Sequence, residues 1–167
     1  LEKSHELKIG EMEFNRSQKT VSISNLKLIP KLGSKSGNTF AISTPQMYFS
    51  NFDINLALDH NYYIFDLIKI ENPKLDITIA DSIKGNKFET AKNLDLYPLV
   101  EPYVNKIEIG NLQFADVDLR FNWFKKELVN KQFNLDFKSI NIGKDQKHSN
   151  LLNSQEFEFS TKDLKTI

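Results

Sequence analysis

The sequence Leu7-Lys8-Ile9-Gly10-Glu11-Met12-Glu13-Phe14 holds the pattern that predicts the fold of this chain. Its apolar residues alternate with other residues except at one double gap, so its form is h-x-h-x-x-h-x-h, where h is apolar. A period of two is typical of β-strands with one apolar face. The same form returns at 21–28, 47–54, 107–114 and 135–142. The sequence therefore predicts a mainly β protein.

The double gap should bend each of these strands. In a regular strand successive side chains alternate between faces, so a three-residue step would move the second apolar pair to the other face. A β-bulge can absorb the extra residue and keep both pairs on one face, or the strand can stop at a corner. We therefore expect a curved antiparallel sheet of repeated kinked strands that forms an open groove or half-barrel. The gap residues suit either device: Gly10, Asn25, Ser50 with Asn51, Gly110 and Ser139.

Three of the patterned segments recur in the same order. The segment 7–14 matches 107–114, 21–28 matches 135–142, and 47–54 matches 157–164. Such self-similarity is typical of a repeat array, although alternating strings in any all-β protein align in places by chance. We predict one β-repeat region over 1–167, with a first copy at about 7–104 and a partial second copy at about 105–167. Because the chain starts at Leu1 and stops within the second copy, we expect a fragment of a longer protein.

The remaining residues of the first copy predict further elements. The segments 64–70 and 75–79 are expected to be strands joined by a turn at 71–74, which contains Pro73. Residues 89–103 have a roughly helical spacing of leucines broken by Pro98 and Pro102. They predict one short helical segment.

Composition and motifs argue against several classes of function. Lys plus Arg and Asp plus Glu both number 22 and there is no cysteine, so the chain has no basic excess for nucleic acid and no thiolate metal site. No apolar run is long enough to span a bilayer. His5, His60 and His148 lie far apart, and none has a second ligand at metal spacing. We expect no enzyme activity, cofactor or metal, and no nucleic-acid partner.

The strand motifs resemble those of one protein family. The segment 7–14 is followed by Val-x-Ile-x-Asn-Leu-x-Leu-Ile-Pro at 21–30, and later by Ile-x-Ile-x-x-Pro-x-Leu-x-Ile at 68–77. In this order and over nearly the whole chain, they resemble the AsmA-like superfamily of bacterial envelope proteins. The resemblance implies an open β-structure, held in the periplasm by an inner-membrane anchor. The N-terminal membrane helix usual in that family is not in this sequence, so the anchor is expected outside it.

The same resemblance implies a non-catalytic role in phospholipid transport or outer-membrane homeostasis. Sheltering an acyl chain is worth about 0.8 kcal/mol per buried CH₂, and bent strands with one continuous apolar face can provide such a groove. The thirteen Phe residues fit either this surface or an ordinary core. The candidate groove residues are Met47, Phe49, Ile107, Ile109, Leu112, Phe114, Val117, Leu119, Phe121, Leu135 and Phe137.

Two other classes of function remain open on the sequence alone. One is a structural or adhesive β-repeat that binds a protein partner, in the envelope or elsewhere, by strand addition at its open edges. The other is a glycan-active β-sandwich enzyme, which needs two neighbouring carboxylates in a cleft. Bound phospholipid would distinguish a lipid-binding segment from a β-repeat that binds a protein partner.

Overall fold

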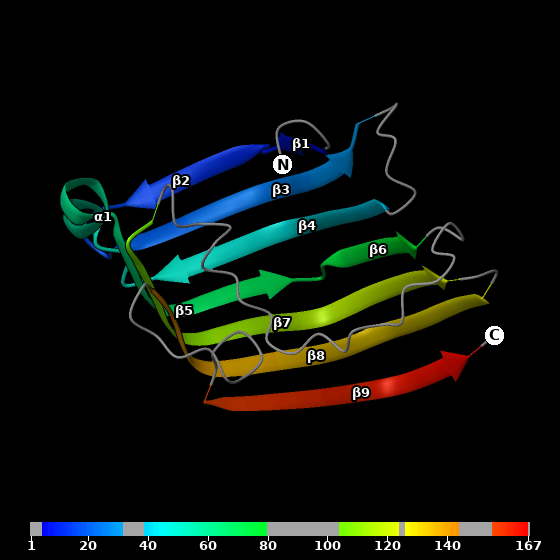
Figure 1. Cartoon of the computed structure of the whole chain (residues 1–167). Helices are drawn as coiled ribbons and strands as arrows, with labels where there is room; N and C mark the ends of the chain where they lie inside the picture. Colours follow the sequence, from blue (N-terminus) through cyan, green and yellow to red (C-terminus); the bar gives the residue numbers. More distant parts are fainter. Residues whose placement is uncertain (1–4, 32–38, 80–103, 124–125, 144–154, 167) are drawn as a thin grey trace.

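The structure is a computed structural model that describes residues 5–31, 39–79, 104–123, 126–143 and 155–166. Within these ranges nine strands form one curved, mixed sheet, and a short helix lies at one end of it (Figure 1). The prediction of a mainly β protein with an open, curved sheet is confirmed. The elements are β1 (His5–Lys8), β2 (Glu11–Asn15), β3 (Thr20–Pro30), β4 (Thr39–Ser50), α1 (Ile54–His60), β5 (Tyr62–Glu71), β6 (Lys74–Ile79), β7 (Lys106–Trp123), β8 (Lys126–Gly143) and β9 (Glu156–Thr166).

The strands follow the order β1-β3-β4-β5-β7-β8-β9 across the sheet. Strand β2 continues β1 along β3, and β6 continues β5 between β4 and β7. The edges are therefore β1 with β2 on one side and β9 on the other, as Figure 1 shows. Among the described strands the two edges do not pair with each other, so the sheet does not close into a barrel.

The sheet is mainly antiparallel, as expected, but it is parallel at one place. Strands β5 and β6 both pair with β7 in parallel, whereas every other pairing is antiparallel. The chain leaves β6 at one end of the sheet and returns through residues 80–105 to begin β7 at the other end. Parallel neighbours need a connection of this length, whereas hairpins do not. The helical segment expected at 89–103 lies outside the described residues.

The predicted turn at 71–74 is a kink within one line of strand. Asn72 has a φ of 48°, and its N–H donates to the Ala115 carbonyl of β7 at 2.8 Å. The Pro73 carbonyl accepts from the Asp118 N–H at 2.9 Å. Because both sides of the kink stay bonded to β7, the chain bends without reversing.

Kinks of this kind fall into two rows that cross the sheet, which we call creases. In the first crease Lys19, Asn51 and Ser139 have positive φ, between 53° and 57°. In the second crease φ is positive at Asn25, Asn72, Asp116 and Gln132, between 48° and 57°. The pairing of neighbouring residues puts Asp66 and Gly110 in the first crease, and Gly10 and Pro45 in the second. Aligned extra residues let each strand bend at the same place without losing its pairing.

Both devices expected for the double gap are present. At Asn25 and Ser139 the strand continues through a positive-φ residue, but at Ser50 it ends and α1 begins after Asp53. The sequence pattern at 47–54 therefore predicted too long a strand, and α1 was not predicted. The helix is defined by its ends, because Asp53 is the N-cap and Asn61, with a φ of 54°, is the C-cap.

The two sequence copies do not repeat by simple translation along the sheet. The first strands of the copies, β1 with β2 and β7, run in opposite directions, because one parallel pairing lies between them. Gly10 and Gly110, which match in sequence, lie in different creases. Further copies in a longer parent remain a prediction.

Candidate functional site: an apolar groove over strands β2 to β5

Two rows of apolar side chains cross the entire sheet between the creases. Each member of a row is paired with the next across neighbouring strands. Because side chains directly opposite one another share a face, each row is a continuous apolar line. The Phe14 row consists of Phe14, Val21, Phe49, Ile68, Leu112, Phe137 and Phe157. The Met12 row consists of Met12, Ile23, Met47, Ile70, Phe114, Leu135 and Phe159.

Burial along these rows changes from the middle of the sheet to its edges. Ile68 and Phe137 in the middle are 8% and 4% exposed, whereas Phe14 and Phe157 at the edges are 39% and 49% exposed. The Met12 row ends in the same way, because Met12 and Phe159 are both exposed. The apolar face is therefore accessible at both sides of the sheet and packed in the centre.

The accessible part on the β2 side forms a groove of about 360 Å³. This volume is at the small end of the range for ligand pockets. Every side chain that lines the groove is aliphatic or aromatic. The lining residues are Met12, Phe14, Val21, Ile23, Phe49, Phe52, Ile54, Tyr63 and Phe65.

Phe52 is the central aromatic residue of this groove. Its ring stacks on Phe65 with centroids 5.4 Å apart and meets Phe14 edge-on at 6.2 Å. The ring of Tyr63 lies 6.4 Å away, nearly parallel. The Phe52 N–H donates to the Lys19 carbonyl at 2.8 Å, which fixes the backbone between β4 and α1. Part of the groove wall is therefore a cluster of aromatic rings in mutual contact.

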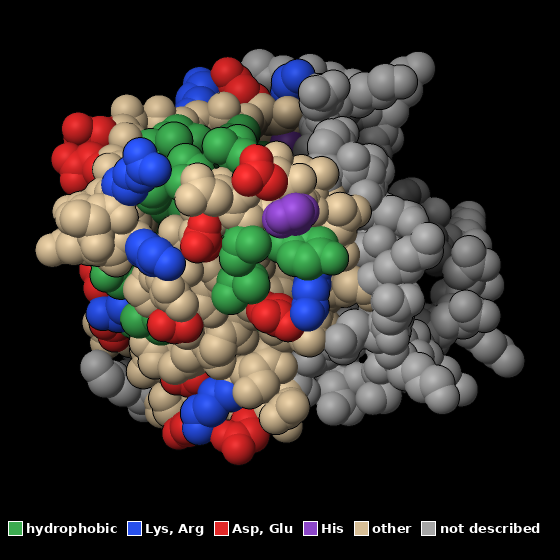
Figure 2. Space-filling view, turned by 90° about the vertical axis from the view of Figure 1, so that its left-hand side faces the viewer, with side chains coloured by type: hydrophobic (Ala, Val, Ile, Leu, Met, Phe, Trp, Pro, Cys, Tyr) green, Lys and Arg blue, Asp and Glu red, His purple; other side chains and the backbone are tan. Residues whose placement is uncertain are grey.

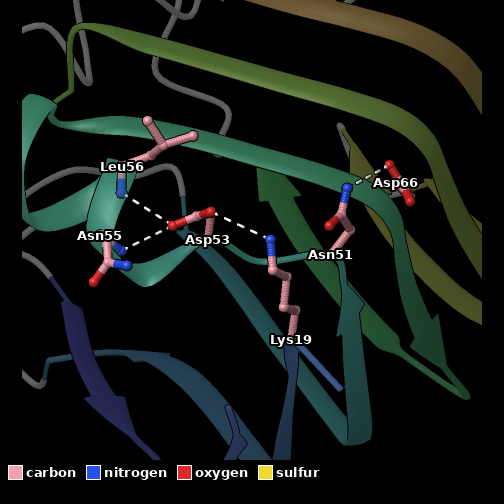
Figure 3. Close-up of polar contacts among 6 residues, drawn as sticks. All are labelled: Lys19, Asn51, Asp53, Asn55, Leu56 and Asp66. Carbon is pink, nitrogen blue, oxygen red and sulfur yellow. Dashed lines mark hydrogen bonds and ion pairs between the residues drawn. The ribbon is translucent and has the colours of Figure 1, made fainter. Parts of the chain in front are cut away.

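A polar framework holds the chain beneath the groove (Figure 3). The Asp53 carboxylate accepts from the N–H groups of Asn55 and Leu56 at 3.0 and 3.2 Å and pairs with the Lys19 ammonium at 3.3 Å. The Leu56 hydrogen bond, followed by the Lys19 contact, lowers the pKa of Asp53 below its ordinary value of 3.8. Across the first crease the Asn51 amide donates to Asp66 at 3.1 Å.

The described residues that line the groove include no His, Cys, Asp, Glu, Lys or Arg. Tyr63 supplies its only titratable side chain. Across the described part of the chain, no three His, Cys, Asp or Glu residues converge in a metal-binding arrangement. A wholly apolar lining favours an apolar occupant, since a polar group buried there would lose its hydrogen bonds to water.

The structure brings the predicted groove residues together on β4, β7 and β8. Met47 and Phe49 lie in the two rows on β4, and Phe49 also lines the groove. Leu119 and Phe121 lie beyond the second crease, half-buried beside Leu75 and Ile77. Val117, fully buried, faces Phe133. The others belong to the central apolar cluster or pack against it: Ile107, Ile109, Leu112, Phe114, Leu135 and Phe137.

Sequence reasoning missed most of the groove itself. Met12, Phe14, Val21 and Ile23 belong to the first sequence copy, whereas the predicted residues came mainly from the second. The strand pattern marks both copies equally. Only the strand order shows that β2 is an edge, where apolar side chains stay accessible.

The end of the molecule that carries α1 also has exposed hydrophobic side chains outside the groove. Figure 2 shows hydrophobic side chains there in separate small groups, with charged side chains between them. Leu58 of α1 is 75% exposed and does not line the groove. It provides an exposed apolar residue for comparison with those of the groove.

No helix in the described ranges has the length and apolarity needed to cross a bilayer. Comparisons with family models, with curated proteins and with solved structures find no match to this chain.

Proposed function

We propose that this chain is a non-catalytic segment of a bacterial envelope protein, and that its apolar β-surface shelters phospholipid acyl chains. The role would be phospholipid transport or outer-membrane homeostasis in the periplasm, with an inner-membrane anchor outside these residues. The observation that carries the proposal is the pair of uninterrupted apolar rows, which end in accessible side chains at both edges of an open sheet. The AsmA-like strand motifs support it.

The lining of the groove supports the proposal, because it offers an acyl chain apolar contact. A lipid tail leaves a bilayer only if its new site replaces most of the burial it loses, at about 0.8 kcal/mol per CH₂. The groove lining offers apolar contact on each wall, and the Phe14 and Met12 rows continue from it toward β9. An acyl chain in the groove would lie beside the β2 end of these rows and meet no charged side chain among the described lining residues.

Native mass spectrometry of the chain purified from cells of a diderm bacterium tests the proposal. We expect the wild type to carry phospholipid. The double variant Met12→Asp with Phe14→Asp should lose most of it, because two carboxylates at the accessible side of the groove disfavour an acyl chain. Both side chains are exposed, so the variant should fold, which circular dichroism checks.

Leu58→Asp is the control, because it places a carboxylate at an exposed apolar position outside the groove. It should retain phospholipid as the wild type does. The proposal is wrong if the wild type carries no phospholipid, or if the double variant and the control retain it equally. Substitution of Phe137 is a poorer test, because a charge at this buried position would unfold the sheet.

The alternative reading, strand addition to a protein partner, concerns the edges of the sheet and not its apolar face. Both edges are open among the described strands. A partner strand would bind the backbone groups of an edge, whereas a lipid would bind the apolar side chains of the face.

A further inference from the structure

The β2 edge combines three features that fit a strand from another chain. Its outward backbone groups have no strand partner among the described residues. Met12 and Phe14 project exposed from one face of it. Glu11 and Glu13 alternate with them and therefore belong to the other face.

The two glutamates are not neutralised by the sheet. Their cross-strand partners on β3 are the uncharged residues Ser24 and Ser22. The Ser22 hydroxyl donates a long hydrogen bond, of 3.5 Å, to the Glu13 carboxylate. Within the described ranges neither carboxylate forms an ion pair.

The other edge segments differ in this respect. On β1, Glu6 pairs with Lys8 at 3.5 Å. On β9, Glu156 pairs with Lys138 at 2.8 Å, which raises the pKa of Lys138 and lowers that of Glu156. Among the described edge residues, β2 therefore has two neighbouring carboxylates without an ion pair, Glu11 and Glu13, whereas β9 has Glu158.

We propose that the β2 edge binds an extended segment of a partner protein in which apolar residues alternate with Lys or Arg. Its backbone continues the ladder of β2, its apolar side chains lie beside Met12 and Phe14, and its basic side chains lie beside Glu11 and Glu13. Main-chain hydrogen bonds provide affinity in this mode of recognition, and the alternate side chains provide specificity. The proposal does not depend on lipid binding, although both would use the side chains of Met12 and Phe14.

Charge also argues against a second copy of this chain as the occupant. Antiparallel pairing of two β2 edges would bring glutamates of both copies together, and like charges opposite each other destabilise a strand pair. A basic strand converts the same positions into opposite-charge pairs.

The test uses the whole chain and two capped peptides of alternating residues, one of valine with lysine and one of valine with glutamate. We expect the lysine peptide to bind, measured by fluorescence anisotropy, and to slow amide exchange at Glu11–Asn15. The glutamate peptide should not bind. Glu11→Lys with Glu13→Lys should weaken the lysine peptide by roughly tenfold or more, since two favourable cross-strand pairs become repulsive, and should give binding to the glutamate peptide.

Glu156→Lys is the control at the opposite edge, because it leaves Glu158 in place, and it should leave lysine-peptide binding unchanged. The proposal is overturned if the lysine peptide does not bind, if protection appears on β9 instead, or if both peptides bind alike. It is equally overturned if the wild type dimerises in sedimentation and protects β2 without peptide, because a second copy would then be the occupant.

Discussion

At the scale of single residues, the shape of this sheet depends on backbone angles that L-amino acids rarely adopt. Outside glycine a left-handed conformation costs about 1–2 kcal/mol, and Asn and Asp tolerate it best. Asn25, Asn51, Asn72 and Asp116 occupy such positions. Hydrogen bonds fix the surrounding chain, as when the Thr44 hydroxyl donates to the Glu71 carbonyl at 2.7 Å beside the second crease.

Asn25 gives a direct test of the cost of a crease. Asn25→Val should lower the free energy of unfolding by about 1–2 kcal/mol, because a β-branched residue resists the φ of 52°. Asn25→Gly should be much milder, since glycine adopts positive φ freely. Denaturant unfolding measures both. Lys27→Val, at an exposed regular position of the same strand, should be tolerated. Equal losses at positions 25 and 27 would show that the crease conformation carries no such cost.

At the scale of elements, the parallel pairing of β5 with β7 depends on a close backbone approach at Gly110. A Cβ at this position would lie 2.7 Å from the Asp66 carbonyl oxygen, whereas one at Gly143 would meet nothing nearer than 3.6 Å. Gly110→Ala should therefore cost about 1–3 kcal/mol in the free energy of unfolding, and Gly143→Ala should be tolerated. Thermal and denaturant unfolding of this matched pair measure the difference. If the two variants are equally stable, the strands can separate slightly at no cost.

The elements also show what the sequence could and could not predict. Apolar spacing predicted the strands, and the double gaps predicted a bulge or corner at Asn25, Asn51 and Ser139, where φ is positive. A second three-residue step, from Phe114 to Val117, marks the kink at Asp116 in the same way but was not used. The Asp53 N-cap signal for α1 was also overlooked. The sequence has no such signal for the direction of neighbouring strands, because apolar residues alternate with the same period in parallel and antiparallel pairs.

At the scale of the whole molecule, the candidate groove depends on which strands lie at an edge. Sequence patterns predict which side chains share a face, and Phe49 and Phe137 do lie in one row. They do not predict that β7 and β8 lie inside the sheet while β2 is an edge. Exposure follows from that order, so Met12 is accessible while Val117 is buried.

The same strand order leaves β2 and β9 as edges that two molecules could bring together. If β9 of one molecule paired with β2 of the next, the apolar rows would continue, with Phe157 beside Phe14 and Phe159 beside Met12. The antiparallel register that aligns them also places Glu158 opposite Glu13, and this repulsion should keep the protein monomeric at neutral pH. Glu13→Lys should therefore promote end-to-end association.

Adding Glu158→Lys to Glu13→Lys should abolish that association, because two like charges again face each other. Sedimentation velocity over a range of concentrations separates the three proteins. If Glu13→Lys stays monomeric, or if the double variant associates as strongly, charge at this pair of positions does not control pairing between edges. The β2 glutamates would then influence pairing with strands of other proteins only, and another feature of the edge would keep copies of this chain apart.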